Sequence, residues 1–256
     1  MILLDVVTRG DSMKNLYMML DNHIREIEQI NEELETLPEG YLIRKRFYYY
    51  HVVKDKQTGI TRNIKLTKQL CRKRYLLIRK IQLENNIKAL TPADLDTRIP
   101  RELIASLPKA YQNLPESYFY HPSIEVWLET PQSTNNLYLE NAVYTYNGIN
   151  FRSLAERIIA EHLDKYGLLF RYDSIYKLNN NQISPDFFIK NPFNNKTVVW
   201  EHFGAFHKEK YADSMNNKMD RYINHGYSQL ENLIATYQYH IRKPERIQNL
   251  IEQIIL

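Results

Sequence analysis

The second half of the chain alternates apolar runs with amphipathic stretches, and this order limits the possible folds more than any other feature. After residue 150 the patterns predict a helix at 153–166, strands at 168–178, 184–190 and 197–203, a helix at 208–225, a strand at 232–237 and a terminal helix from Pro244. Segments rich in Asn at 179–182 and 191–195 predict the turns between strands. We therefore expect an α+β (α/β) domain with a mixed sheet flanked by helices.

The first half begins with a heptad pattern over residues 11–37. One core position holds Met13, Leu20, Ile27 and Leu34, and the other holds Leu16, His23, Ile30 and Leu37. Such a seam predicts either a coiled-coil homodimer or packing against the basic helix expected at 67–90 of the same chain. A further helix start is expected at Thr91 and Pro92.

Two β-rich runs, 41–53 and 60–66, surround a polar link at 54–59 and predict a hairpin between these helices. On a regular first strand, the side chains of Arg44, Arg46, Tyr48 and Tyr50 would share one face. Interleaved basic and aromatic side chains suit nucleotide backbones and stacked bases. In the alternative interpretation, the tyrosines only cover the helices beneath them.

Charge is distributed unevenly along the chain. Residues 41–90 contain 14 basic and 2 acidic side chains, whereas residues 1–40 contain 3 basic and 9 acidic ones, and the whole chain has a net charge of +4. A basic block of this kind favours contact with a polyanion, unless it only offsets the acidic helix. The predicted nucleic-acid contacts here are Arg44, Arg46, Arg72, Lys73 and Arg74.

Residues 107–150 are rich in Pro, Asn and Tyr and show little periodicity. They are expected to link a coiled-coil and β-hairpin module at residues 1–106 to a second domain at residues 151–256.

Several classes of protein are excluded by composition. The 7 glycines are widely separated, which argues against the dinucleotide fingerprint, the P-loop and the nucleophile elbow of serine hydrolases. A single cysteine, Cys71, excludes an internal disulfide framework and suits the cytoplasm. The start of the chain does not resemble a signal peptide, and no apolar run has the length of a membrane span, so no membrane association is expected.

Three acids of the second half lie among apolar residues. Glu156 borders the apolar stripe of its helix, Asp186 lies in the run Ser184–Ile189, and Glu201 closes the run Thr197–Glu201. Acids inside apolar strands are costly unless a positive group neutralises them, and oxygen ligands suit Mg²⁺ or Mn²⁺. The alternatives are a capping box formed by Ser153 and Glu156, a strand-start role for Asp186, and a metal-free ion pair between Glu201 and Lys218.

With these residues in this order, the chain resembles the PD-(D/E)XK nuclease superfamily over roughly residues 150–240. Pro185-Asp186 and Glu201 are similar to its paired metal motif, and Glu156 is similar to its helical acid. The phrases at 151–156, 200–204 and 232–236 look like a branch of uncharacterised bacterial proteins with a WEHxG-type third motif. The resemblance implies a restriction-endonuclease-like core that holds Mg²⁺ or Mn²⁺ through Glu156, Asp186 and Glu201.

The lysine of that family pattern is replaced by Phe203 in this chain. On helix 208–225, Lys218 falls within the stripe of Tyr211, Met215 and Tyr222, so its side chain is expected to point toward the sheet. The superfamily is known for migrated lysines, and by this resemblance Lys218 is the expected substitute. His202 is the rival, although on a regular strand it would face away from Glu201.

These observations lead to the hypothesis of a metal-dependent nuclease that acts on DNA, with RNA as a further possibility. Its catalytic residues would be Glu156, Asp186, Glu201 and Lys218, while Arg152 would contact phosphate or lie free on the surface. The alternatives are a nuclease-like core without activity that serves in nucleic-acid binding or assembly, and a coiled-coil protein that binds a protein partner.

Overall fold

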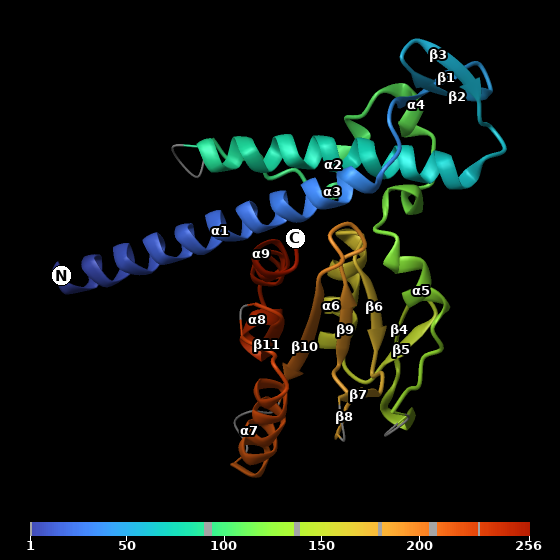
Figure 1. The fold of residues 1–256 in the computed structure, drawn as a ribbon. Coiled ribbons are helices and arrows are strands. Elements are labelled where there is room, and N and C mark those ends of the chain that lie inside the picture. Colours follow the sequence, from blue (N-terminus) through green and yellow to red (C-terminus); the bar gives the residue numbers. More distant parts are fainter. Residues whose placement is uncertain (1, 90–93, 136–138, 179–180, 205–208, 230) are drawn as a thin grey trace. The chain divides into compact units, whose positions relative to one another are not determined.

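The computed structural model describes residues 2–89, 94–135, 139–178, 181–204, 209–229 and 231–256. It combines helices with mixed sheets, so the predicted α+β class is confirmed (Figure 1). The chain forms two compact units, residues 1–120 and residues 121–256. Their division falls within the region 107–150, and much of that region is folded in one unit or the other. None of the described helices has the length and apolar character needed to cross a bilayer.

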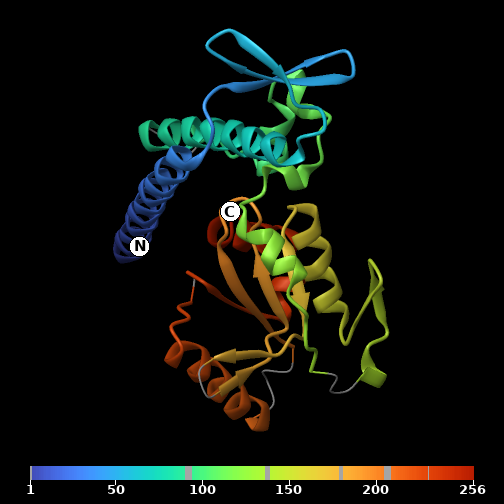
Figure 2. The same ribbon diagram turned by 45° about the vertical axis from the view of Figure 1, so that its right-hand side comes forward.

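Unit 1 is built on two long helices, α1 (Ile2–Thr36) and α2 (Ile64–Lys88), which lie side by side (Figures 1 and 2). Glu33 and Glu26 of α1 form ion pairs with Arg72 and Arg79 of α2 at 2.7 and 2.8 Å. The predicted seam residues from Leu20 to Leu37 are all buried or half-buried. The internal pairing of an acidic with a basic helix is therefore confirmed for this part of α1, and the homodimer stays a prediction.

The β-rich region of unit 1 differs from the predicted hairpin. It forms an antiparallel sheet in the order β1 (Tyr41–Lys45), β2 (Tyr48–Val53) and β3 (Lys56–Gly59). The predicted first strand is broken at Arg46, whose φ of 54° turns the chain, so Arg46 does not share a strand face with Arg44. The predicted link therefore contains β3.

The predicted second strand at 60–66 is also wrong. Asn63 accepts a hydrogen bond from the Leu66 amide and caps α2, which begins at Ile64. The apolar residues that suggested a strand are followed by Leu70 and Cys71, buried at helical spacing. The remaining elements of unit 1 are short: α3 (Pro100–Ala105), α4 (Lys109–Gln112) and η2 (Glu116–Phe119). The predicted helix start at Thr91 and Pro92 lies outside the described residues.

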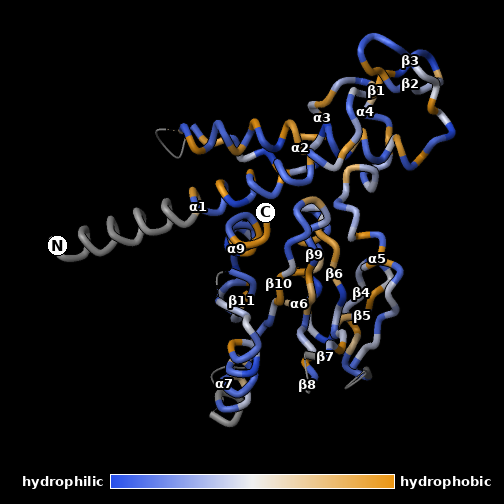
Figure 3. The backbone as a smooth tube through the Cα atoms, viewed as in Figure 1, coloured by the Kyte–Doolittle hydropathy of each residue, from blue (hydrophilic) through white to orange (hydrophobic). Residues whose placement is uncertain are grey.

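Unit 2 contains a four-stranded sheet in the order β11-β10-β9-β6, in which only the β10–β11 pair is parallel. Its strands are β6 (Leu169–Tyr172), β9 (Phe187–Lys190), β10 (Thr197–Phe203) and β11 (Leu233–Tyr237). Figure 3 shows hydrophobic residues along β10 and on α9 (Pro244–Ile254), as expected of core elements. Val198, Val199 and Trp200 are fully buried, so β10 is covered on both faces.

Helices and two small hairpins surround this sheet. They are α5 (Ser123–Glu129), η3 (Leu139–Asn141), α6 (Leu154–Lys165), α7 (Glu209–Asn224), α8 (Gln238–Ile241), the hairpin of β4 (Tyr144–Tyr146) with β5 (Ile149–Phe151), and the hairpin of β7 (Tyr176–Leu178) with β8 (Asn181–Ile183). Met219 and Tyr222 of α7 pack with Val199 and Phe203 of β10. Helix α7 therefore covers the face of the sheet to which Glu201 also belongs.

Two strand predictions in unit 2 need correction. The predicted strand 168–178 is divided into β6 and β7 at Asp173, whose φ is 47°. The predicted turn at 179–182 overlaps β8, which pairs with β7, and residues 179–180 lie outside the described residues. The turn at 191–195 is confirmed, because the Asn191 side chain accepts a hydrogen bond from the Phe193 amide and Asn195 has a φ of 62°.

Candidate active site

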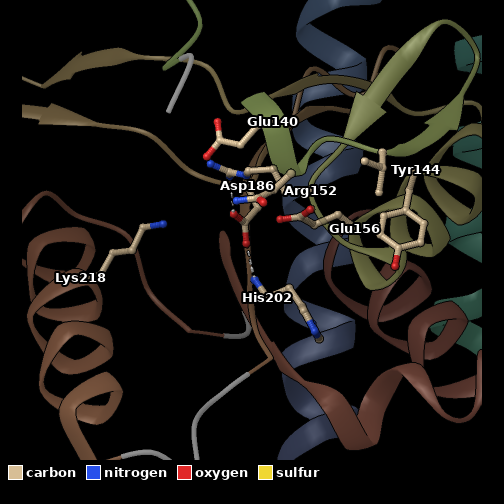
Figure 4. Close-up of a pocket in the computed structure, with 9 residues that line it drawn as sticks. Glu140, Tyr144, Arg152, Glu156, Asp186, His202 and Lys218 are labelled. Carbon is tan, nitrogen blue, oxygen red and sulfur yellow. Dashed lines mark hydrogen bonds and ion pairs between the residues drawn. The ribbon is translucent and has the colours of Figure 1, made fainter. Parts of the chain in front are cut away.

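An open pocket of about 640 Å³ lies in unit 2, close to the start of β9 and the end of β10. Its lining joins acids and bases from several elements: Glu140, Asn141, Val143, Tyr144, Arg152, Glu156, Asp186, His202 and Lys218. Figure 4 shows Glu140, Arg152, Glu156 and Asp186 gathered on one side and Lys218 of α7 on the other. The structure thus brings Glu156, Asp186, Lys218 and Arg152 together at one site. Glu201 does not line the pocket, but it accepts a hydrogen bond from Lys218.

Asp186 lies at the centre of this arrangement, directly before β9. Its Oδ2 accepts a hydrogen bond from the His202 amide at 2.7 Å, which fixes the carboxylate against β10. Its Oδ1 lies 3.6 Å from an Arg152 guanidinium nitrogen, and the same nitrogen lies 3.3 Å from Asp173. Arg152 is therefore held between two carboxylates, and it is neither a free surface residue nor an isolated phosphate contact.

Glu156 caps α6 and also faces the pocket. Its Oε2 accepts hydrogen bonds from the Ser153 amide at 2.7 Å and from the Tyr172 hydroxyl at 3.1 Å, while Ser153 Oγ accepts one from the Glu156 amide. Burial and, second, the charge of Asp186 raise the pKa of Glu156. The capping box is confirmed, and the same carboxyl group lies within electrostatic reach of Asp186.

Glu201 is the most deeply buried of the three acids, with 1% of the residue exposed. Lys218 Nζ donates to its Oε2 at 2.7 Å, and the Tyr222 hydroxyl donates to its Oε1. Burial and, second, the charge of Asp186 raise the pKa of Glu201 to about 8, although the two donors favour the ionised form. The charge of Asp186 therefore raises the pKa of both Glu156 and Glu201, which indicates an excess of negative charge at this site.

Lys218 points from α7 toward the sheet, as the helical spacing predicts, and it binds Glu201 of β10. The charges of Glu201 and Asp186 outweigh burial and raise its pKa, so Lys218 remains cationic. Phe203, two residues after Glu201, is 4% exposed and packs with Met219 and Tyr222. The position at which the resemblance implies a lysine is thus part of the core in this chain.

His202 does not occupy the predicted rival role through its ring. Its Nδ1 lies 3.2 Å from Thr236 Oγ1, and burial lowers the pKa of the ring. Its contribution to the acids comes from the backbone amide, which binds Asp186. Figure 4 shows the ring directed away from Lys218.

The donors present fit a hard divalent cation. All three acids supply oxygen atoms, each carboxylate oxygen has a second lone pair, and a cation would relieve the repulsion centred on Asp186. Among the described residues, however, no three His, Cys, Asp or Glu side chains form a ready-made metal cluster. An ion here would therefore be held by Asp186 with Glu201 or Glu156, and completed by water or phosphate, as is usual for Mg²⁺.

The basic residues predicted in unit 1 divide into two groups. Arg44 and Arg46 are exposed. Arg72 is 3% exposed and binds Glu33 and the Phe119 carbonyl, and Lys73 donates to the Pro38 carbonyl, while Arg74 is half-buried. Arg72 and Lys73 therefore contribute to the packing of unit 1 and are not part of an exposed phosphate-binding surface.

Glu140, which lines the pocket, and Tyr222, which donates a hydrogen bond to Glu201, were not predicted as site residues. Glu140 lies on η3, in a region whose sequence shows no periodicity, so no pattern could place it beside Arg152. Tyr222 had a signal, because it belongs to the same helical stripe as Lys218 and must therefore face the same strand.

Comparisons with known proteins give one partial relative. A protein of Methanocaldococcus jannaschii, named "Uncharacterized protein MJ1519", is 33% identical over 75 residues, which is 29% of this chain and 6% of that protein's length. No family model matches the chain. No solved structure matches it either.

The raised pKa of Glu201 predicts how stability depends on pH. Because the folded pKa of about 8 exceeds the unfolded value near 4.5, the folded state binds this proton more tightly. Stability should therefore fall as pH rises from about 4.5 to about 8, by at most about 1.4 kcal/mol per pH unit. Thermal melting at pH 5.5, 7 and 8.5 should show a steeper decline for the wild type than for Glu201→Gln.

The matched control for this prediction is Glu161→Gln on α6, since that acid is one-third exposed and forms an ion pair with Arg157. It should keep the pH dependence of the wild type. Parallel melting curves for the wild type and Glu201→Gln would contradict the raised pKa.

Proposed function

We propose that this chain is a divalent-metal-dependent nuclease that hydrolyses phosphodiester bonds in DNA. The observation that carries the proposal is that Glu156, Asp186 and Lys218 line one pocket and that Lys218 binds Glu201. The charge of Asp186 acts on both glutamates. The order α6, β6, β9, β10, α7 and β11 is the order that the resemblance to PD-(D/E)XK nucleases implies. RNA contains the same phosphodiester group, so it belongs in the test as a second substrate.

Each residue has a distinct part in this proposal. Asp186 and Glu201 would hold Mg²⁺ or Mn²⁺, with Glu156 as a further oxygen donor. A bound ion of this kind lowers the pKa of water and neutralises charge on phosphate. Lys218 places a fixed positive charge where negative charge develops on the phosphate oxygens. Arg152 neutralises Asp186 before a substrate binds, and its guanidinium is suited to bind phosphate afterwards.

Tyr222 is a positioning residue in this scheme. Tyr222 is fully buried, and its hydroxyl donates a hydrogen bond to Glu201 Oε1. Burial and the charge of Glu201 hold the pKa of Tyr222 far above its usual value, so the hydroxyl keeps its proton. It therefore fixes one Glu201 oxygen while Lys218 binds the other.

A second candidate function is nucleic-acid binding or assembly by a nuclease-like core without activity. Two observations favour it: Phe203 replaces the motif lysine, and both Glu201 oxygens already accept hydrogen bonds from the protein. The same contacts would form a stable ion pair without any metal. Retention of Asp186 and Glu156 next to this pair favours the nuclease, since the three acids outnumber the two cations, Arg152 and Lys218, that neutralise them.

The experiment that tests the proposal is incubation of plasmid, single-stranded DNA and RNA with the full chain and Mg²⁺, Mn²⁺ or EDTA. We expect cleavage of DNA with either metal and none with EDTA. Absence of cleavage under all conditions, together with tight DNA binding that weakens with salt, would reject the nuclease and support the second candidate.

A further inference from the structure

The turn between β1 and β2 projects away from α2 (Figure 2). It carries two exposed aromatic residues, Phe47 and Tyr48. Phe47 is 80% exposed and Tyr48 is 60% exposed. We infer that this turn, residues 45–48 and called the β1–β2 tip below, binds single-stranded nucleic acid by stacking bases on Phe47 and Tyr48. The inference rests on the nucleic-acid role proposed above and names the strand form that unit 1 recognises.

The geometry of the tip keeps these rings in solvent. Lys45 and Tyr48 are the last paired residues of the two strands, and Arg46 turns the chain in a left-handed conformation. Phe47 therefore lies beyond the last pair of the sheet, where the structure offers it no core. A single exposed apolar residue is ordinary, but two exposed aromatic residues that are adjacent in sequence at a turn offer rings on which bases can stack.

Positive charge surrounds the aromatic pair. The exposed cations of the sheet and its turns are Arg44, Lys45, Arg46, Lys54, Lys56 and Arg62, and the only acid within residues 41–62 is Asp55. Among the described residues, none of these six cations forms an ion pair with a carboxylate. Their charge is therefore available to a polyanion.

The cations accompany tyrosines on both faces of the strands. Arg44 lies 5.9 Å from the ring centre of Tyr49, and Lys45 lies 5.6 Å from that of Tyr50. Arg44 and Tyr49 are register partners, whereas Lys45 and Tyr50 belong to the opposite face. Cationic and aromatic side chains therefore lie next to each other along the sheet. Single-stranded nucleic acid needs both kinds of group, because cations bind its phosphates and aromatic rings stack its bases.

A single strand fits this arrangement better than a duplex or a lipid surface. Bases in a duplex are already stacked, so Phe47 could reach them only by opening a base step. Insertion into a lipid surface favours apolar residues on one side of an element, whereas here the cations and rings are shared between both faces. Binding of a single strand uses both the cations and the aromatic rings, and it does not depend on a particular base sequence.

The test measures binding without cleavage, using the full chain in EDTA and a fluorescent 20-mer as a single strand or as a duplex. Fluorescence anisotropy should show tighter binding to the single strand. Combined Phe47→Ala and Tyr48→Ala substitution should weaken single-strand binding by about tenfold or more, with less effect on the duplex. The control is Ile81→Ala on α2, because Ile81 is also exposed, at 56%, and should leave binding unchanged.

A second variant makes the contact visible directly. Phe47→Trp should retain binding, and its emission should be quenched by the single strand. Equal loss on both oligonucleotides, unchanged affinity of the double variant, or unquenched emission would overturn the inference. Binding of anionic vesicles that depends on the tip, without oligonucleotide binding, would also overturn it. Since EDTA prevents metal-dependent cleavage, the result stands apart from the outcome of the nuclease assay.

Discussion

Replacing Asp186 with asparagine is expected to reduce metal-dependent DNA cleavage by at least about 1,000-fold. Asp186 is the shared neighbour of Glu156 and Glu201, and its charge raises the pKa of both. A bound metal supplies several kcal/mol of charge stabilisation, and each ~1.4 kcal/mol changes the rate tenfold. Asparagine has nearly the same shape, and its side-chain oxygen can still accept the hydrogen bond from the His202 amide. The loss should therefore appear in the cleavage rate without a loss of folding.

The matched control is Asp220→Asn, because Asp220 is an exposed acid on α7 two residues from Lys218. Initial rates on plasmid DNA with Mn²⁺ should be close to wild type for this variant, and both variants should show the circular dichroism of the folded protein. Equal cleavage by the wild type and Asp186→Asn would mean that the cleaving site lies elsewhere.

The second large effect is expected at Lys218. Lys218→Met should reduce the cleavage rate by about 100-fold, which is the usual cost of removing one preorganised group that stabilises the transition state. The substitution also removes the cation that lowers the pKa of Glu201. The acid side of the pH–rate profile should therefore move to higher pH, because a metal ligand must be deprotonated to bind the ion.

Lys218→Arg tests the chemical role of the lysine, since it keeps the charge and should recover part of the rate. The positional control is Arg221→Met, whose exposed side chain lies about one turn along α7 from Lys218. Unchanged rate and pH profile in Lys218→Met would show that Lys218 is only the partner of a structural ion pair. Reduced rate with an unmoved pH profile would contradict the coupling between Lys218 and Glu201.

The sequence predicts the elements of unit 2 best where an apolar run is long and bounded by strong signals. The predicted strand at 197–203 coincides with β10, and the terminal helix begins at Pro244 as predicted. In the region 41–66 the prediction failed, because a left-handed arginine is rare and nothing in the residue pattern marks the turn at Arg46. The start of α2 was missed because the apolar residues around its cap, Asn63, were assigned to a strand.

The site was predictable to the extent that it depends on local periodicity. Glu201 follows Trp200 on β10 and Asp186 directly precedes Phe187 of β9. Because Trp200 and Phe187 are partners in the antiparallel register, the proximity of the two acids follows from it. Lys218 followed from the helical stripe. The ion-pair partners of Arg72 and Arg152 could not be predicted from local periodicity, since each pair depends on tertiary packing. A basic sequence block therefore indicated more nucleic-acid contacts than the structure leaves exposed.

The most direct test of the metal site is a Mn²⁺ titration followed by electron paramagnetic resonance, without nucleic acid, at pH 8. We expect the wild type and Asp220→Asn to bind Mn²⁺ and Asp186→Asn to lose this binding. Binding should weaken at pH 6, because protons compete for Glu201, whose pKa is about 8. If the wild type leaves all Mn²⁺ free at millimolar concentration, the acids around Asp186 do not form a metal site and the chain is not a metal-dependent nuclease.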